Sequence, residues 1–187
     1  MRNLIRRVVG GYKSLKLVGE DQGFVFFQGQ DPDTKQSVAI KILPQLLGQD
    51  PQISAGFRSL AQTIRQLNHP NIATVRKVGE ESGLPYVVTR AIEKGQPLAQ
   101  KLDQPWAVDA AADLVMQVGH ALEHAYKKGI VHGSLSPENV VVQENGQVMV
   151  TDFGLTELQN LLGLQLKETA SPFLAPEQAT GQPAHAR

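Results

Sequence analysis

The segment GIVHGSLSPENVVV occupies residues 129–142 and joins a helical stretch to two short strands. A helix is expected over residues 106–128, because apolar side chains recur there at spacings of three and four and Gly129 follows as a C-terminal glycine. The runs VVV and VMV, at 140–142 and 148–150, predict a β-hairpin. The sequence therefore predicts a polar loop between a helix and a hairpin. The predicted apolar stripe of the helix comprises Val108, Ala112, Val115, Val118, Leu122 and Ala125.

The first half of the chain alternates β-rich runs with turn residues. Five such runs predict an antiparallel sheet. One helix interrupts them, since apolar residues recur at helical spacing between Phe57 and Leu67 before His69-Pro70-Asn71 ends the pattern. The fold class is therefore α+β. The five predicted strands cover residues 12–19, 23–29, 37–43, 73–79 and 84–90.

The composition excludes several classes of function. The chain has 187 residues, 41% of them apolar, which is enough for the core of a soluble globular protein. Its 18 basic and 18 acidic side chains balance, so no net charge attracts nucleic acid or an anionic membrane. Without cysteine it forms no disulfide or thiolate metal site, and we expect a cytoplasmic location. No apolar run reaches the roughly 18 residues that a membrane span needs.

Five short motifs occur in one order along the chain, and together they resemble a bacterial Ser/Thr protein kinase domain from about Tyr12 onward. The resemblance implies a two-lobe fold. The N-lobe, residues 1–94, would hold a five-stranded antiparallel sheet with one helix, and the C-lobe, residues 95–187, would be mainly helical and incomplete. We expect a fragment of a longer polypeptide, with a truncated gene product as the alternative. The motifs are VAIK at 38–41, HPNI at 69–72, the catalytic loop at 132–139, DFG at 152–154 and APE at 175–177.

The resemblance also implies where a nucleotide and its metal would bind. Lys41 would contact the α- and β-phosphates, Asp152 would bind Mg²⁺, and Asn139 would offer a second metal ligand. The alternatives are a strand lysine with an exposed ammonium, a turn aspartate and an asparagine bonded to backbone. The other implied contacts are Gly19 in the phosphate-covering loop, Ala39, Thr89 behind the adenine pocket and Ile92 in the hinge.

The positions that carry the chemistry depart from the family pattern, and no catalytic position is intact. Ser134 replaces the catalytic aspartate, and a hydroxyl does not accept a proton as a carboxylate does. Ser136 replaces a lysine that neutralises the transferring phosphoryl group, and Gly133 replaces an arginine that would hold a phosphorylated segment. Leu60 replaces the glutamate that pairs with the strand lysine, or is simply a core residue.

The phosphate-covering loop is altered as well. Without gaps, only Gly19 of the three glycines remains, and Phe24 takes the third glycine position. Phe26 replaces the valine above the adenine. A gap of one residue would instead give these two roles to Gly23 and Val25. ATP and Mg²⁺ binding is therefore expected to be weak or absent.

Two interpretations follow. The chain is a pseudokinase that regulates or scaffolds a protein partner, or it is a slow Ser/Thr kinase with a protein substrate. Residues 155–166 predict an amphipathic helix, either packed locally or offered to a partner, and His120 and His124 are read as a solvated helix face. Without the rest of a C-lobe, the helix at 106–128 would keep apolar surface, which predicts marginal stability, self-association or a missing remainder.

Overall fold

The computed structural model describes residues 8–21, 24–42, 51–81, 83–154, 173–180 and 182. They belong to two compact units. Unit 1 takes the described residues up to Arg65 and residues 74–91, and unit 2 takes residues 66–73 and those from Ile92 onward. The predicted amphipathic helix at 155–166 lies outside the described residues.

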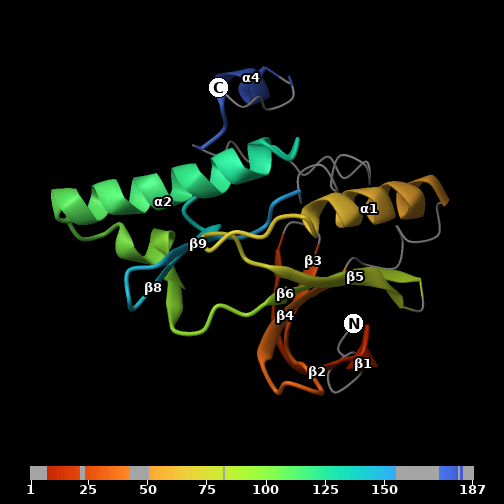
Figure 1. Ribbon diagram of the computed structural model, residues 1–187. Coiled ribbons are helices and arrows are strands. Elements are labelled where there is room, and N and C mark those ends of the chain that lie inside the picture. The colour runs from red at the N-terminus through yellow and green to blue at the C-terminus, as the bar shows by residue number, and fades with distance from the viewer. Residues whose placement is uncertain are drawn as a thin grey trace. The chain divides into compact units, whose positions relative to one another are not determined.

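The sheet of unit 1 is antiparallel and contains six strands in the order β1-β2-β3-β4-β6-β5 (Figure 1). All five predicted strands are present. The predicted number is wrong by one because β1, a two-residue strand, also pairs with β2. The signal for β1 was the Val-Val-Gly-Gly sequence, which ends a strand with a tight glycine turn. The strands are β1 Val8–Val9, β2 Tyr12–Asp21, β3 Phe24–Gln30, β4 Ser37–Ile42, β5 Val75–Glu81 and β6 Leu84–Arg90.

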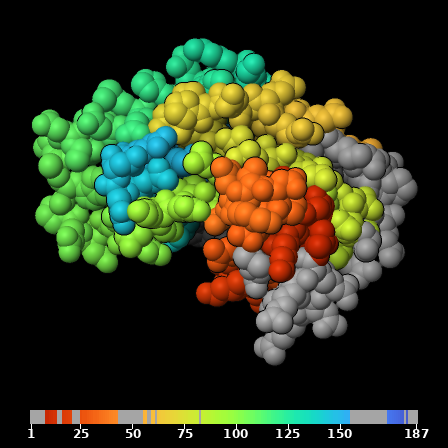
Figure 2. All heavy atoms as spheres, turned by 60° about the horizontal axis from the view of Figure 1, so that its bottom comes forward, coloured from red at the N-terminus to blue at the C-terminus, as the bar shows by residue number. Residues whose placement is uncertain are grey.

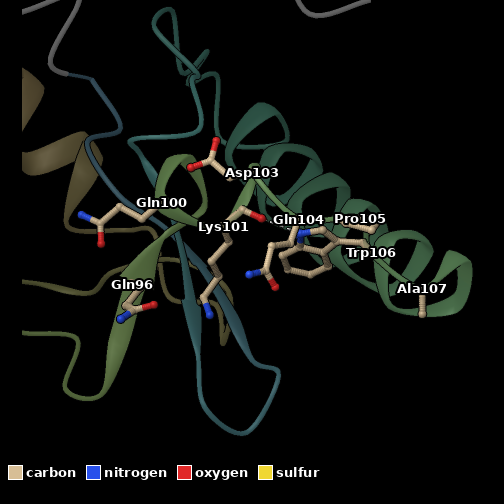
Figure 3. A pocket seen from close by; sticks show the side chains of 8 residues that line it. All are labelled: Gln96, Gln100, Lys101, Asp103, Gln104, Pro105, Trp106 and Ala107. Carbon is tan, nitrogen blue, oxygen red and sulfur yellow. Dashed lines mark hydrogen bonds between the residues drawn. The ribbon is translucent and has the colours of Figure 1, made fainter.

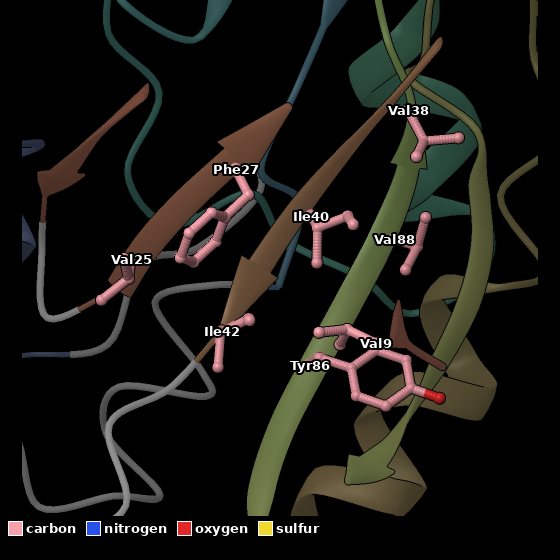
Figure 4. Packing of buried hydrophobic residues seen from close by; sticks show 8 residues of the cluster. All are labelled: Val9, Val25, Phe27, Val38, Ile40, Ile42, Tyr86 and Val88. Atoms are coloured by element: carbon pink, nitrogen blue, oxygen red, sulfur yellow. The ribbon is translucent and has the colours of Figure 1, made fainter. Parts of the chain in front are cut away.

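One face of this sheet forms the hydrophobic core of unit 1 (Figure 4). Along β4 the side chains alternate, so that Val38, Ile40 and Ile42 are buried in the core. Ala39 and Lys41 consequently belong to the other face. The core cluster comprises Val9, Val25, Phe27, Val38, Ile40, Ile42, Tyr86 and Val88.

The turn at Gly10 ties together the two edge strands of the sheet. Its N–H donates to Glu81 Oε2 at 2.7 Å, and Lys77 Nζ donates to its carbonyl at 2.8 Å. Both partners lie on β5, at the opposite end of the strand order from β1. Gly10 has φ 59°, and a Cβ there would overlap the phenol ring of Tyr86. Only glycine fits this position.

Helix α1, Pro51–Ile64, is the predicted helix of unit 1. It packs beside β5 and β6. Leu60 and Ile64, one turn apart, are both buried. The core cluster therefore lies on one face of the sheet. The buried apolar residues of α1 belong to a helix that packs beside β5 and β6.

Unit 2 contains a three-stranded sheet in the order β7-β8-β9 and the long helix α2 (Figure 1). The hairpin β8–β9 and helix α2 confirm the sequence prediction, whereas β7, which ends in Pro97, is not among the predicted strands. A proline is tolerated there because β7 is an edge strand. Figure 2 shows the blue hairpin surface bordered by the green residues of β7 and η3. The elements are β7 Gly95–Pro97, η3 Leu98–Lys101, α2 Val108–Tyr126, β8 Val140–Gln143, β9 Val148–Val150 and α4 Pro176–Ala179.

Helix α2 packs beside β9 with a side that matches the predicted apolar stripe only in part. Ala121 and Ala125 are fully buried, whereas Val108 is 82% exposed and Val115 is 66% exposed. The predicted stripe mixed these two sides, because apolar residues cover more of the helix than its packing uses. In the described part of the chain, no helix is both long and apolar enough to cross a bilayer.

We predict that Gly10→Ala destabilises unit 1 by about 2 to 4 kcal/mol, because the new methyl group meets Tyr86 and the backbone is left-handed. Gly11→Ala is the matched control. Gly11 also has a positive φ, of 89°, but a Cβ there meets nothing within 4 Å. Guanidinium unfolding followed by circular dichroism measures both. Equal losses in the two variants would show that the Tyr86 contact is unimportant.

Candidate functional site

In unit 1, Lys41 lies beneath an aromatic ring on the neighbouring strand. Phe26 of β3 is directly opposite Lys41 of β4, and Gly19 of β2 is directly opposite Phe26. Directly opposed side chains lie on the same face of a sheet. The ammonium of Lys41 is 5.0 Å from the centre of the Phe26 ring, and the lysine is 8% exposed. A buried ammonium at this distance gains a cation–π interaction.

The predicted nucleotide residues of unit 1 belong to one face of its sheet. Ala39 lies two residues from Lys41 on β4 and pairs with Thr89 of β6. Gly19 joins the same face through its pairing with Phe26. This face is the one opposite the core cluster. The fold thus brings four of the predicted residues, Gly19, Ala39, Lys41 and Thr89, onto one face of neighbouring strands.

The register also decides between the two alignments of the phosphate-covering loop. Val25, which a one-residue gap would place above the adenine, is only 2% exposed and pairs with Ile42 in the core. Phe26 is therefore the residue beside Lys41. Gly23 and the side chain of Phe24 lie outside the described residues.

Leu60 lies on α1 and is 9% exposed. Its position is the one where the kinase resemblance expects a glutamate. The leucine side chain carries no charge and cannot form an ion pair with an ammonium. The burial agrees with the interpretation of Leu60 as a core residue.

In unit 2, Asn139 connects the polar loop to Asp152. Ser136 Oγ donates to Asn139 Oδ1 at 2.9 Å, and Asn139 Nδ2 donates to Asp152 Oδ2 at 3.2 Å. The backbone of Asn139 accepts from the N–H of Thr151 at 2.9 Å. The amide oxygen that was predicted to bind metal therefore already accepts one hydrogen bond, and one lone pair remains.

His132 holds the start of the same loop. It is 4% exposed, its Nε2 lies 2.8 Å from the carbonyl oxygen of Thr151, and its ring centre lies 4.7 Å from that of Phe153. The N–H of Ser134 donates to His132 Nδ1 at 3.4 Å. A neutral imidazole with its proton on Nε2 satisfies both contacts. His132 thus fixes the backbone around Ser134 without any contribution from the Ser134 hydroxyl.

Two backbone conformations mark this loop as specialised. Asp152 has φ 69°, which is uncommon for a residue other than glycine, and such strain concentrates at functional sites. Gly133 has φ 79°, and its carbonyl accepts from Gln178 Nε2 of α4 at 2.6 Å. An arginine at residue 133 would adopt this conformation at a cost. The strain at Asp152 was not evident from the sequence.

The residues expected to hold a metal fit Mg²⁺ better than a transition metal. In the described ranges, no group of three or more His, Cys, Asp or Glu side chains could hold a metal ion. Asp152 supplies one carboxylate and Asn139 one amide oxygen, and Mg²⁺ is commonly bound by one or two protein oxygens together with phosphates and water. Ile92, the predicted hinge contact, belongs to unit 2, whereas Thr89 belongs to unit 1.

His69 lies beside His124 of α2, and the sequence alone does not indicate this pair. The rings of His69 and His124 are 5.1 Å apart. Burial lowers the pKa of His69 below 6.5, and the nearby His124 and His120 lower it further. His69 Nδ1 accepts from the N–H of Asn71 at 3.2 Å, and this bond is lost on protonation of Nδ1. His124 therefore has a packed neighbour and does not lie on a wholly solvated face.

A separate open pocket lies in unit 2 between β7 and the start of α2 (Figure 3). Its volume is about 490 Å³. The indole N–H of Trp106 donates to the carbonyl of Lys101 at 2.9 Å and closes one end of the connecting loop. None of the predicted site residues lines this pocket. The lining residues are Gln96, Gln100, Lys101, Asp103, Gln104, Pro105, Trp106 and Ala107.

Comparison with known proteins gives one consistent family. Residues 12–186 match the protein kinase domain. The chain is 33% identical to a probable serine/threonine-protein kinase of Streptomyces coelicolor over 97% of its own length and 28% of that protein. It is 30% identical to the serine/threonine-protein kinase PknA of Mycobacterium tuberculosis over 94% of its own length and 43% of that protein. The chain thus spans less than half of these relatives.

Solved structures show the same fold. The kinase domain of Mycobacterium tuberculosis PknI superposes with a TM-score of 0.73 at 21% identity, covering 96% of this chain and 67% of the PknI chain. A double mutant of the same domain gives a TM-score of 0.72. The predicted kinase-like fold is confirmed.

We predict that unit 2 loses stability as the pH falls below about 6.5. The pKa of His69 is lower in the folded chain than its ordinary value of 6.5, so the unfolded chain binds more protons. This stabilisation is complete above pH 6.5 and is lost as the pH falls toward the folded pKa. Thermal unfolding followed by Trp106 fluorescence measures the loss.

His69→Asn should make this pH dependence smaller, because an asparagine oxygen can accept from Asn71 without titrating. His120→Gln, at an exposed position of α2, is the control that removes a histidine and should keep most of the dependence. An unchanged pH profile in His69→Asn would exclude His69 as its source.

Proposed function

Because the chain belongs to the protein kinase domain family, we propose that it is a pseudokinase: a regulatory or scaffolding module with weak or no ATP binding. The supporting observation is the hydrogen-bonded chain Ser136–Asn139–Asp152, which keeps the catalytic loop folded although Ser134 stands in place of the proton-accepting carboxylate. The family transfers phosphate from ATP with Mg²⁺ to protein substrates. In our proposal the chain keeps the kinase fold and does not catalyse that reaction.

Phosphate transfer to a hydroxyl requires a group near the acceptor that takes up its proton. An aspartate does this in the family, and general-base assistance is worth about 10² to 10⁴ in rate. Serine is itself a hydroxyl and has no comparable proton affinity at neutral pH. Ser134 therefore removes the acid–base contribution and leaves only the positioning of the reactants.

The second serine affects both charge and metal binding. At Ser136 the positive charge that would stabilise the transferring phosphoryl group is absent. Its hydroxyl also donates a hydrogen bond to Asn139 Oδ1 at 2.9 Å. A metal ion at Asn139 would have to share that oxygen with Ser136 or displace the hydroxyl. Asp152 then remains as the stronger of the two predicted metal ligands.

The substitutions in unit 1 would weaken nucleotide binding. Phe26 places a ring over the ammonium of Lys41, the group that would contact phosphate oxygens. Leu60 supplies no carboxylate to orient that lysine. The phosphates of a nucleotide must therefore compete with the Phe26 ring for the ammonium of Lys41. Residue 60 also provides no glutamate to orient this lysine.

A domain that catalyses no reaction acts through binding, so the proposed partner is a protein. A slow kinase is the second candidate. Its support is that Lys41, Asn139 and Asp152 are all present, with Asp152 in a strained conformation.

We predict no phosphotransfer above the level of an Asp152→Ala control, because proton acceptor and phosphoryl-stabilising charge are both missing. The measurement is transfer of labelled phosphate from Mg·ATP to the chain itself and to a generic basic protein. Mg·ATP should also raise the melting temperature little or not at all. Turnover that Asp152→Ala abolishes would establish the slow kinase instead.

We further predict that Phe26→Val strengthens Mg·ATP binding by about two- to tenfold, because the cation–π competitor of the phosphates is removed. A thermal-shift titration with Mg·ATP compares this variant with the unaltered chain. Adding Lys41→Met should cancel the gain. Phe173→Val, at a phenylalanine that is 53% exposed, controls for the loss of a ring elsewhere. No gain in Phe26→Val would show that Phe26 does not limit nucleotide binding.

A further inference from the structure

Residues 69–73 of unit 2 lie along the edge of β9 that β8 does not use (Figure 1). We call them the edge segment. Ile72 pairs with Val150 in the parallel direction. The carbonyl of Asn71 accepts from the N–H of Val150 at 2.8 Å, and the N–H of Ala73 donates to the carbonyl of Val150 at 2.9 Å. The edge segment therefore acts as a fourth strand of the β7-β8-β9 sheet.

The side chain of Asn71 ties the edge segment to α2 and to the hairpin. Its Nδ2 donates to Gln117 Oε1 of α2 and to the carbonyl of Val148, each at 2.8 Å. Beside it, Gln147 Nε2 of the hairpin donates to the carbonyl of Pro70 at 2.9 Å, which is a contact between neutral groups. Asn71 is 8% exposed, so loss of its contacts would leave a buried amide without partners. The position of Asn71 therefore decides whether the edge segment stays on β9.

The backbone of Asn71 is held by a side chain that can take up a proton. His69 Nδ1 accepts from the N–H of Asn71 at 3.2 Å. The carbonyl of His69 accepts from the N–H of Ile72 at 3.1 Å, and the two bonds together close a turn at the start of the edge segment. A protonated Nδ1 carries a hydrogen of its own and cannot accept. Proton uptake by His69 therefore opens one of the two bonds of this turn.

A second partner for the His69 ring lies beside it. The rings of His69 and His124 are 5.1 Å apart, and His124 Nε2 is buried without a hydrogen-bond partner among the described residues. Most buried polar atoms have a partner, so an unpaired one requires an explanation. This nitrogen is enclosed by the residues around it, so no open face of the molecule is involved. With its proton on Nδ1, His124 offers Nε2 as an acceptor.

We propose that His69 is a pH-sensitive latch that exchanges one partner for the other. Neutral His69 accepts from Asn71 and keeps the edge segment on β9. When Nδ1 takes a proton from the solvent, the ring turns, donates to His124 Nε2 and releases the N–H of Asn71. The edge segment then separates from Val150, and β9 loses a neighbour two residues before Asp152. The latch goes beyond the proposed function and operates without a nucleotide.

The groups around His69 keep the latch closed at neutral pH. Burial lowers the pKa of His69, and His124 and His120 of α2 lower it further. Glu123 of the same helix acts on His120 and is paired with Lys127 at 2.7 Å. Within the described ranges, the titratable groups that act on His69 are thus two histidines and no carboxylate. The closed form therefore prevails above about pH 6.5, and the open form gains as the pH falls toward the folded pKa.

Hydrogen exchange followed by NMR tests the latch at about pH 7.5 and about pH 5, on either side of the ordinary histidine pKa of about 6.5. The amides of Ala73 and Val150 bond between the edge segment and β9, and their protection factors should fall about three- to tenfold at the lower pH. The amide of Gln143, which donates to the carbonyl of Gln147 within the hairpin at 2.9 Å, is the internal control and should keep its protection. Equal losses at all three amides, or no loss at any of them, would overturn the latch.

Two variants test the exchange of partners. His69→Asn keeps an acceptor for the N–H of Asn71 that does not titrate, so Ala73 and Val150 should stay protected at both pH values. His124→Phe keeps a ring and removes the acceptor, so the latch should open only at a lower pH. If His124 acted only as a repelling neighbour of His69, its removal would move the opening to a higher pH. A move to higher pH, or no move, would therefore contradict the exchange of partners. Circular dichroism at neutral pH checks that both variants fold.

The unaltered chain provides a test that needs no variant. Long-range proton–nitrogen NMR spectra of the histidine rings report which ring nitrogen carries the proton. At neutral pH the latch requires the proton on Nε2 of His69 and on Nδ1 of His124, because the other nitrogen of each ring has to accept. A proton on Nε2 of His124 would leave the protonated His69 ring without its second partner and would overturn the proposal.

Discussion

The hydrogen bonds of one buried amide hold the polar loop of unit 2 in place. Asn139 is 7% exposed, accepts from Ser136, donates to Asp152 and is joined through its backbone to Thr151. A buried amide without partners costs free energy, so each of these contacts constrains the others. His132 adds a second buried anchor through Thr151. The loop therefore needs His132 and Asn139 in order to fold, whereas Ser134 is half-buried and contributes its backbone.

The same separation of folding from chemistry occurs in unit 1. The core face of β4 requires Val38, Ile40 and Ile42, because each fills the cluster on that side of the sheet. The opposite face carries Lys41 beside Phe26, and neither residue belongs to the core cluster. A substitution on that face therefore leaves the core contacts of the strand in place. The proposed loss of kinase chemistry is compatible with a retained kinase fold for this reason.

Local patterns predicted most of the fold, and tertiary contacts account for what was missed. The strands β2 to β6, the hairpin and both long helices follow from side-chain periodicity. β7 exists only through its pairing with β8, and the neighbourhood of His69 and His124 joins residues far apart in sequence. The direction of α2 packing also depends on its neighbours, since its apolar residues cover two sides. For the site, sequence named Asn139 and Asp152, but not the hydrogen bonds that join them.

The proposed loss of chemistry involves substitutions in both units. A carboxylate at residue 134 would restore the proton acceptor, yet Ser136 would still occupy Asn139 Oδ1, and Phe26 would still lie over Lys41. Ser136 and Phe26 each form a contact that can stabilise the fold. Reversal at one position would therefore remove a stabilising contact or add an unsupported charge without rebuilding the rest. Such a chain can change most readily at exposed positions, where a substitution does not disturb the buried amide.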